Sequence, residues 1–271
     1  MRFPTPADGL ELEFDEDFRG AAVDPARWVP YYLPHWSSRE RSAARLGRHQ
    51  DRLALHIVAN QPAWAPEWDG ELRASVLQTG LYAGPLGSGE GQLHFRPDMV
   101  VREEQENRRT YTPHHGYVEL RCRALADPSV LVALWLMGVE VQPDQCGEIC
   151  VAEIFGTDVG PASAKVGMGI KAFADPLLAE EFSADEYPID ATEFHTYAAS
   201  WTADGVGFFL DGELVKTTTQ SPMYPMQLML AIYEFPDRIN PGAVPPTKTA
   251  YPKPFVVDFV RGYGRPKADE P

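Results

Sequence analysis

Two glutamates five residues apart are the side chains of this sequence best suited to chemistry. Glu148 and Glu153 lie within residues 147–156, which read GEICVAEIFG. When two carboxyl groups are close, repulsion raises the pKa of one and leaves the other ionised. The protonated group can give its proton to a leaving sugar oxygen, while the ionised group attacks the sugar carbon. The pair could therefore act on a glycosidic bond, although on this segment alone two solvated acids on an exposed strand face are the preferred interpretation.

The segment that carries the two acids is predicted to be a β-strand with one extra residue. In a regular strand, residues five apart point to opposite faces. A β-bulge at Val151 or Ala152 would return both acids to one face. About four steps of roughly 3.3 Å then separate the α-carbons, and leaning side chains bring the carboxyl groups to about 6 Å. Retaining glycosidases need about 5–5.5 Å and inverting ones about 6.5–9.5 Å, so this estimate leaves both classes open.

The bulge also divides the neighbouring side chains between two environments. It directs Cys150 and Phe155 toward the cleft with the acids, and it directs Ile149 and Ile154 toward the core. Both faces are then chemically consistent, which favours the bulge over a regular strand.

Many short strands must position this segment. Residues 117–125 alternate apolar and polar side chains, which is typical of a half-buried strand. Residues 131–141 are nearly all apolar and indicate a central strand, although a buried helix of that length is also possible. The pair Asp211-Gly212 predicts a two-residue hairpin turn. Further strands are expected at 53–59, 194–201, 206–210, from 213, 226–234 and 255–263, with one short helix near 177–182. This pattern predicts an all-β sandwich or jelly roll.

Composition limits the class of protein and of partner. The chain has 271 residues, 44% of them hydrophobic, and no repeat or long linker interrupts it, so we expect one domain over residues 1–271. A net charge of −15 disfavours nucleic acid and membrane surfaces and favours a neutral substrate. The N-terminal residues lack the apolar segment of a secretory signal. We expect a soluble monomer, cytoplasmic as given or secreted if a leader has been removed.

The cysteines do not form a disulfide framework. There are three of them, Cys122, Cys146 and Cys150. Four strand steps separate the last two by roughly 13 Å, which is too far for a bond. A bond between Cys122 and Cys150 on neighbouring strands stays open without further support.

Residues 148–153 resemble the Glu-x-Asp-x-x-Glu signature of glycoside hydrolase family 16, which includes laminarinases, agarases and related endo-glycosidases. The similarity continues on both sides in the order of the family. The other similar segments are FDEDF at 14–18 with DPARW at 24–28, GYVELR at 116–121, FHTY at 194–197 with Trp201, the hairpin 206–215, and DFVR at 258–261. Each is weak alone, whereas the ordered set is fairly specific and covers most of the chain.

The resemblance implies a β-jelly roll of two antiparallel sheets with a concave substrate cleft. It assigns Glu148 as nucleophile and Glu153 as acid/base. The Asp of the signature, which in the family is held to bond and tune the nucleophile, is Cys150 here. A thiol is a weak donor, so such a chain could be slow, differently tuned or inactive. Cys150 is not expected to replace the nucleophile, because two flanking carboxylates suppress its thiolate.

Aromatic side chains near the cleft are candidates for sugar binding. The loop 31–36 and Trp135 are two sources, and for both the alternative is packing in the core. Tyr233 and Glu234 lie where the family resemblance implies a strand that ends at the cleft. The substrate-binding candidates are Tyr32, His35, Trp36, Trp135, Tyr233 and Glu234. The long insertion 78–111 is expected to shape the cleft.

The resemblance also implies a structural calcium on the convex face, with Asp258 as a carboxylate ligand; a solvated or hydrogen-bonded Asp is the alternative. No cofactor is expected to be required. The sequence thus predicts a retaining endo-glycosidase that cuts a β-linked polysaccharide of the β-glucan or galactan type. Two alternatives stay open, namely a non-catalytic carbohydrate-binding protein on the same scaffold and a transglycosylase.

Overall fold

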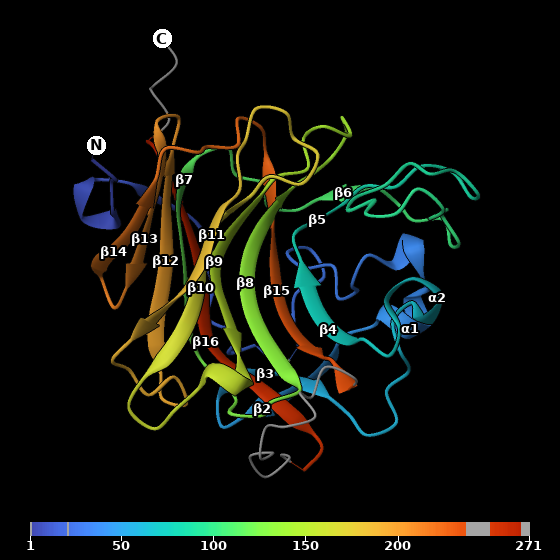
Figure 1. Ribbon diagram of the computed structural model, residues 1–271, viewed down its shortest axis with the longest axis horizontal. Helices are drawn as coiled ribbons and strands as arrows, with labels where there is room; N and C mark the ends of the chain where they lie inside the picture. The colour runs from blue at the N-terminus through green and yellow to red at the C-terminus, as the bar shows by residue number, and fades with distance from the viewer. Residues whose placement is uncertain (1, 21, 237–249, 267–271) are drawn as a thin grey trace.

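Two antiparallel β-sheets stacked face to face form the body of the protein (Figure 1). The computed structural model describes residues 2–20, 22–236 and 250–266. The six-stranded sheet has the order β11-β10-β9-β8-β15-β4. Its strands are β4 (Arg73–Gln78), β8 (Val130–Gly138), β9 (Glu148–Phe155), β10 (Ala164–Lys171), β11 (Glu181–Tyr187) and β15 (Met226–Glu234).

The second sheet has eight strands in the order β14-β13-β12-β7-β16-β3-β2, and β1 also pairs with β16. These strands are β1 (Glu11–Glu16), β2 (Arg45–His49), β3 (Arg52–Ile57), β7 (Gly116–Arg123), β12 (His195–Thr202), β13 (Gly205–Leu210), β14 (Glu213–Thr218) and β16 (Lys253–Gly264). A small ribbon pairs β5 (Gly80–Leu81) with β6 (Arg108–Arg109). The predicted all-β sandwich of two antiparallel sheets is confirmed.

Helices are few and short. The α-helices are α1 (Arg39–Ser42) and α2 (Pro66–Asp69), and the 3-10 helices are η1 (Pro6–Asp8), η2 (Pro34–Trp36) and η3 (Gly156–Asp158). Among the described residues, none of these helices is long and apolar enough to span a membrane.

Apolar side chains from both sheets fill the space between them. Leu134 of β8, Ile149 and Ile154 of β9 and Phe208 of β13 belong to this core. A separate apolar cluster lies on the opposite face of the six-stranded sheet, where Trp135 and Tyr233 pack with side chains of the N-terminal loops. The six-stranded sheet is therefore covered in part on both faces, which explains why β8 and β15 are buried along their whole length.

Two expectations about local structure have opposite outcomes. The hairpin turn at Asp211-Gly212 is confirmed, with φ angles of 49° and 85°. The short helix near 177–182 is wrong, because β11 begins at Glu181 and pairs with β10 from that residue onward. From Glu181 onward, the backbone N–H and C=O groups form hydrogen bonds with the edge of β10, whereas in a helix they would bond to one another.

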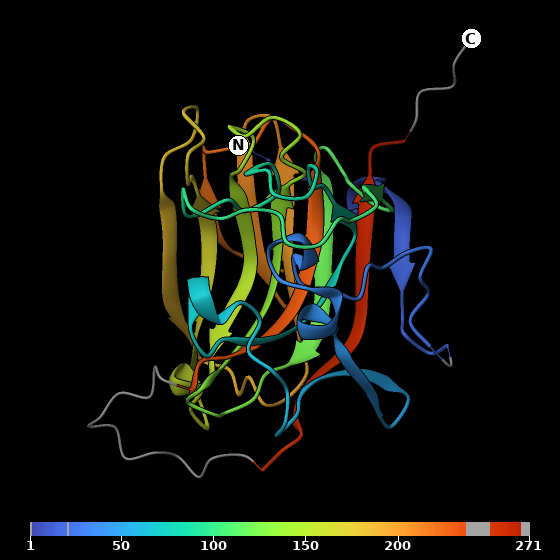
Figure 2. The same ribbon diagram turned by 90° about the vertical axis from the view of Figure 1, so that its right-hand side faces the viewer.

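The insertion 78–111 is mostly irregular and contains β5 and β6. It extends beyond the end of the six-stranded sheet, as the two views show (Figures 1 and 2). Its backbone is fixed by local bonds, for example from Gly84 N to Glu90 O at 2.9 Å. Leu93 and Phe95 of this insertion reach the pocket that contains the two acids, so the insertion shapes the cleft as expected.

Candidate active site

A β-bulge at Val151 brings the two acids to one face of β9. Ala152 pairs with Leu134 on β8, whereas Cys150 pairs with the next residue, Trp135, which leaves Val151 as the extra residue. Glu148 and Glu153 therefore line the same pocket, of about 500 Å³. Ile149 and Ile154 point into the core between the sheets. The predicted bulge and both predicted faces are present.

The acids and Cys150 form a tight group. One oxygen from each carboxyl group and the Cys150 sulfur all lie within 4.8 Å of one another. The thiol lies 4.0 Å from Glu148 Oε2 and is fully buried. Glu148 is also buried, and 11% of the Glu153 side chain is exposed. The two carboxyl groups are thus close enough to act on one bond.

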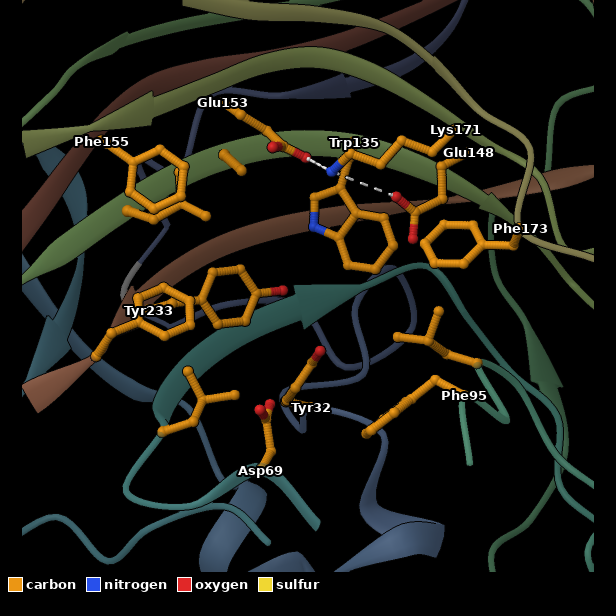
Figure 3. Close-up of a pocket in the computed structure, with 15 residues that line it drawn as sticks. Tyr32, Asp69, Phe95, Trp135, Glu148, Glu153, Phe155, Lys171, Phe173 and Tyr233 are labelled. Carbon is orange, nitrogen blue, oxygen red and sulfur yellow. Dashed lines mark hydrogen bonds and ion pairs between the residues drawn. The ribbon is translucent and has the colours of Figure 1, made fainter. Parts of the chain in front are cut away.

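Lys171, which the sequence interpretation missed, lies between the two acids (Figure 3). Its Nζ is 2.6 Å from Glu153 Oε1 and 3.9 Å from Glu148 Oε2. Lys171 is the last residue of β10 and pairs with Glu148 in the sheet register. A signal was present, because residues 164–171 (AKVGMGIK) alternate in period two and place Lys171 on the face opposite the apolar residues.

Burial and charge together set the protonation of this group. Burial raises the pKa of Glu148 to about 8; Lys171 opposes this shift and Glu153 adds to it. Burial and the two carboxylates raise the pKa of the Cys150 thiol well above its usual value. Groups coupled so closely titrate as a unit. The pocket therefore holds a neutral thiol and a carboxyl pair that retains a proton near neutral pH.

Aromatic side chains form much of the pocket wall. Tyr32, Trp135 and Tyr233, three of the substrate-binding candidates, line it, and the rings of Tyr32 and Tyr233 meet edge to face at 5.3 Å. Phe155 and Phe235 also line the pocket, and Phe155 lies at the end away from Glu148 (Figure 3). Rings of this kind offer apolar surface to the faces of a sugar. Asp69, the last residue of α2, and Phe173, in the loop after β10, also line the pocket; no periodic pattern singled them out.

Four sequence candidates lie away from this pocket. Trp36 and His35 are completely buried. Trp36 Nε1 donates to Gln92 O at 2.6 Å, and burial lowers the pKa of His35 to about 3. Both residues support the loop behind the pocket wall and do not line the pocket.

The other two candidates are held by ion pairs. Glu234 is bound by Lys253 at 2.7 Å and by Arg73 at 3.1 Å. Asp258 lies in the eight-stranded sheet, where Arg52 and Arg121 contact its carboxylate at 2.8 and 2.6 Å. A calcium ion at Asp258 would have to compete with both arginines.

Comparisons with known proteins found related sequences and related structures. The family model described as "Glycosyl hydrolases family 16" matches residues 103–245. A glucan endo-1,3-beta-glucosidase A1 of Niallia circulans is 20% identical over 233 residues, which is 81% of this chain and 32% of that protein. The chain thus spans about a third of the length of this curated relative.

Solved structures share the fold. A GlcNAcα1-4Gal releasing endo-β-galactosidase from Clostridium perfringens has a TM-score of 0.77 and 25% identity, over 94% of this chain and 62% of that chain. A laminarinase from Flavobacterium sp. UMI-01 has a TM-score of 0.61 and 18% identity, over 93% of this chain and 100% of that chain.

Proposed function

Because the chain belongs to glycoside hydrolase family 16, we propose that it is a retaining endo-glycosidase acting on a β-linked polysaccharide. The observation that carries the proposal is the bulge at Val151, which places Glu148 and Glu153 on one face. One oxygen of each carboxyl group lies within 4.8 Å of the other. That separation supports the retaining class, which needs about 5–5.5 Å, and leaves little room for the water of an inverting mechanism.

The reaction proceeds in two displacements. Following the family resemblance, the Glu148 carboxylate attacks the anomeric carbon while Glu153 gives its proton to the departing glycosidic oxygen. Water then replaces the enzyme at the anomeric carbon, and Glu153 takes the proton of that water. Because the pair holds one proton, that proton must reside on Glu153 when the sugar is bound. Without a bound sugar, Lys171 lies closer to Glu153, at 2.6 Å, than to Glu148, at 3.9 Å, so its charge favours the proton on Glu148. The proposed mechanism therefore requires that this proton moves to Glu153 when the sugar binds.

A neutral polysaccharide fits the pocket best. Among the described residues that line it, Lys171 is the one cation, and both catalytic acids already contact it. The net charge of −15 further disfavours a polyanionic chain. A β-glucan or a galactan is therefore the proposed substrate class. The relatives named above include both a glucanase and a galactosidase.

The test is an assay across β-1,3-, β-1,4- and mixed-linked glucans, galactans and agars, with proton NMR of the first products. Products of retained configuration are expected. Glu148→Ala should abolish turnover, and azide should restore part of it as a glycosyl azide of inverted configuration. If azide restored turnover in Glu153→Ala and not in Glu148→Ala, with the same glycosyl azide as product, the two acids would have exchanged roles. Inverted products from the unmodified protein would exclude the covalent intermediate.

A second candidate is a carbohydrate-binding protein without catalysis. Cys150 in place of the signature Asp favours it, because a buried thiol is a weak donor to Glu148. Binding of a polysaccharide without any product across the whole panel would select this function.

A further inference from the structure

A second pocket adjoins the catalytic one beyond Glu148. Leu93, Phe95 and Phe173 line both pockets, so the two are continuous. Figure 3 shows Phe95 and Phe173 on the Glu148 side of the catalytic pocket. The second pocket has a volume of about 670 Å³, which lies within the range of about 300–1,000 Å³ typical of small-molecule sites. We call it the Glu140 pocket, and its other lining residues include Glu140, Val141 and Pro143.

Glu140 is a buried acid with spare capacity to bind. It is 6% exposed, and its Oε1 accepts a hydrogen bond from Leu93 N at 2.9 Å. Among the described residues, no cation forms an ion pair with it. Its backbone has φ of 58°, a left-handed conformation that is unfavourable for a glutamate. Strained backbone that places a buried polar group in a cavity is typical of a ligand site.

The walls around Glu140 are apolar and accessible. Phe95, Val141 and Phe173 are 41, 40 and 53% exposed, although each is a large apolar side chain. Among the described residues that line this pocket, none is lysine or arginine, and Glu90 is a second acid. A sulfated or carboxylated sugar would therefore meet no lysine or arginine among these residues. The matching ligand is neutral, and it presents a hydrogen-bond donor close to an apolar group.

We propose that the Glu140 pocket binds an N-acetylhexosamine unit of the substrate, next to the sugar that Glu148 attacks. The amide N–H of the acetamido group donates to Glu140, and the acetyl methyl group packs against Val141 and the phenyl rings. A plain hexose lacks the methyl group and would leave the apolar wall exposed to water. This inference rests on the proposed function for its reaction, and it narrows the substrate from a plain glucan or galactan to a β-linked chain that carries N-acetylhexosamine units.

The test is an NMR titration of the whole protein with three probes: N-acetylglucosamine, N-acetylgalactosamine and glucose. We expect at least one N-acetyl sugar to bind at least about tenfold more tightly than glucose. Glu140→Leu removes the acceptor and should weaken that binding about tenfold or more. Val141→Asn removes apolar surface at an exposed position and should weaken it several-fold. Glu213→Leu, at an exposed acid of β14, is the matched control and should bind as the unmodified protein does.

Each other outcome has a definite meaning. Equal affinity for glucose and both N-acetyl sugars would overturn the assignment of ligand class. Unchanged binding in a folded Glu140→Leu protein would overturn the role of the carboxylate. If Glu140→Leu does not fold, Val141→Asn takes its place, and unchanged binding in that variant would overturn the assignment of the pocket. Hydrolysis of plain glucans or galactans without binding of N-acetyl sugars would refute this inference alone. Binding of N-acetyl sugars without hydrolysis of any β-linked polysaccharide, including one that contains N-acetylhexosamine, would refute the proposed function alone.

Discussion

At the scale of single residues, Lys171 has the largest effect of any nearby charge on the pKa of Glu148. Replacing it with Met removes the charge that stabilises ionised Glu148, so the pKa of Glu148 should rise further. A smaller fraction of Glu148 is then ionised at acidic pH. We expect the acidic limb of the kcat/KM profile to move to higher pH, with a loss of about tenfold or more at the low-pH end.

Two variants separate charge from packing in this experiment. Lys171→Arg keeps the charge and should retain most of the profile. Lys165→Met removes an exposed lysine of the same strand, which pairs with Asp158 at 4.0 Å, and should have no effect on the profile. An acidic limb that stays in place in Lys171→Met would refute the electrostatic role.

Cys150 permits a second test at this scale. Cys150→Asp restores the family signature and, when ionised, adds a negative charge between Glu148 and Glu153. The pKa of the acid should rise, so the pH optimum should move upward. Cys150→Ser should leave the optimum nearly unchanged. Turnover against pH measures both; activity found solely in Cys150→Asp would mean that the natural chain has lost catalysis, and an unmoved optimum would contradict the charge argument.

At the scale of strands, the bulge depends on its neighbour β10. Gly169 pairs with Cys150, has φ of 141°, and a Cβ there would lie 2.1 Å from Glu181 O. Gly169→Ala should therefore destabilise the sheet by about 3 kcal/mol, from backbone strain and a clash with main chain. For a chain of this size the midpoint of thermal unfolding should fall by roughly 6–12 °C.

Gly212→Ala, in the hairpin turn between β13 and β14, is the matched control for Gly169→Ala. Gly212 has φ of 85°, but nothing lies within 4 Å of an added Cβ. This variant carries backbone strain without the clash and should cost only about 1 kcal/mol. Equal losses in the two variants would show that the close approach to Glu181 is unimportant.

Strand patterns could be predicted from the sequence where they are local. The alternation in 117–125 and the odd spacing of the acids led to β7 and to the bulge. The segment 177–182 was misread as a helix, because the partner edge that makes Glu181 begin a strand lies on β10 and cannot be seen in the segment itself.

Side-chain environment was harder to predict, because it depends on residues far away in the sequence. Trp36 was a reasonable sugar-binding candidate, yet Gln92, 56 positions away, accepts its indole N–H inside the loop cluster. Glu234 ends β15 beside the cleft as expected, but Lys253 from the other sheet binds it. Neither contact can be predicted from the residues that neighbour Trp36 or Glu234 in the sequence.

At the scale of the whole molecule, a buried ion cluster joins the two sheets. Lys253 of β16 contacts Glu234 of β15 at 2.7 Å and Asp127, before β8, at 3.1 Å; all three side chains are at most 2% exposed. Lys253→Met would leave two acids without this cation. We expect a loss of about 3 kcal/mol in the free energy of unfolding, measured by denaturant titration.

The exposed pair of Lys165 and Asp158 supplies the comparison for this cluster. Lys165→Met should cost less than about 1 kcal/mol, because 53% of its side chain is in solvent and such pairs contribute little. A loss as small as this in Lys253→Met would mean that the cluster does not hold the sheets together.

The burial of all three cysteines has a practical consequence for spectroscopy. Cys122, Cys146 and Cys150 are free and at most 7% exposed, and burial raises the pKa of each thiol. Maleimide and iodoacetamide reagents require an accessible thiolate, so the native chain should give almost no labelling background. A single cysteine introduced at Leu177, which is 84% exposed, would accept a fluorophore or spin label without prior removal of the native thiols.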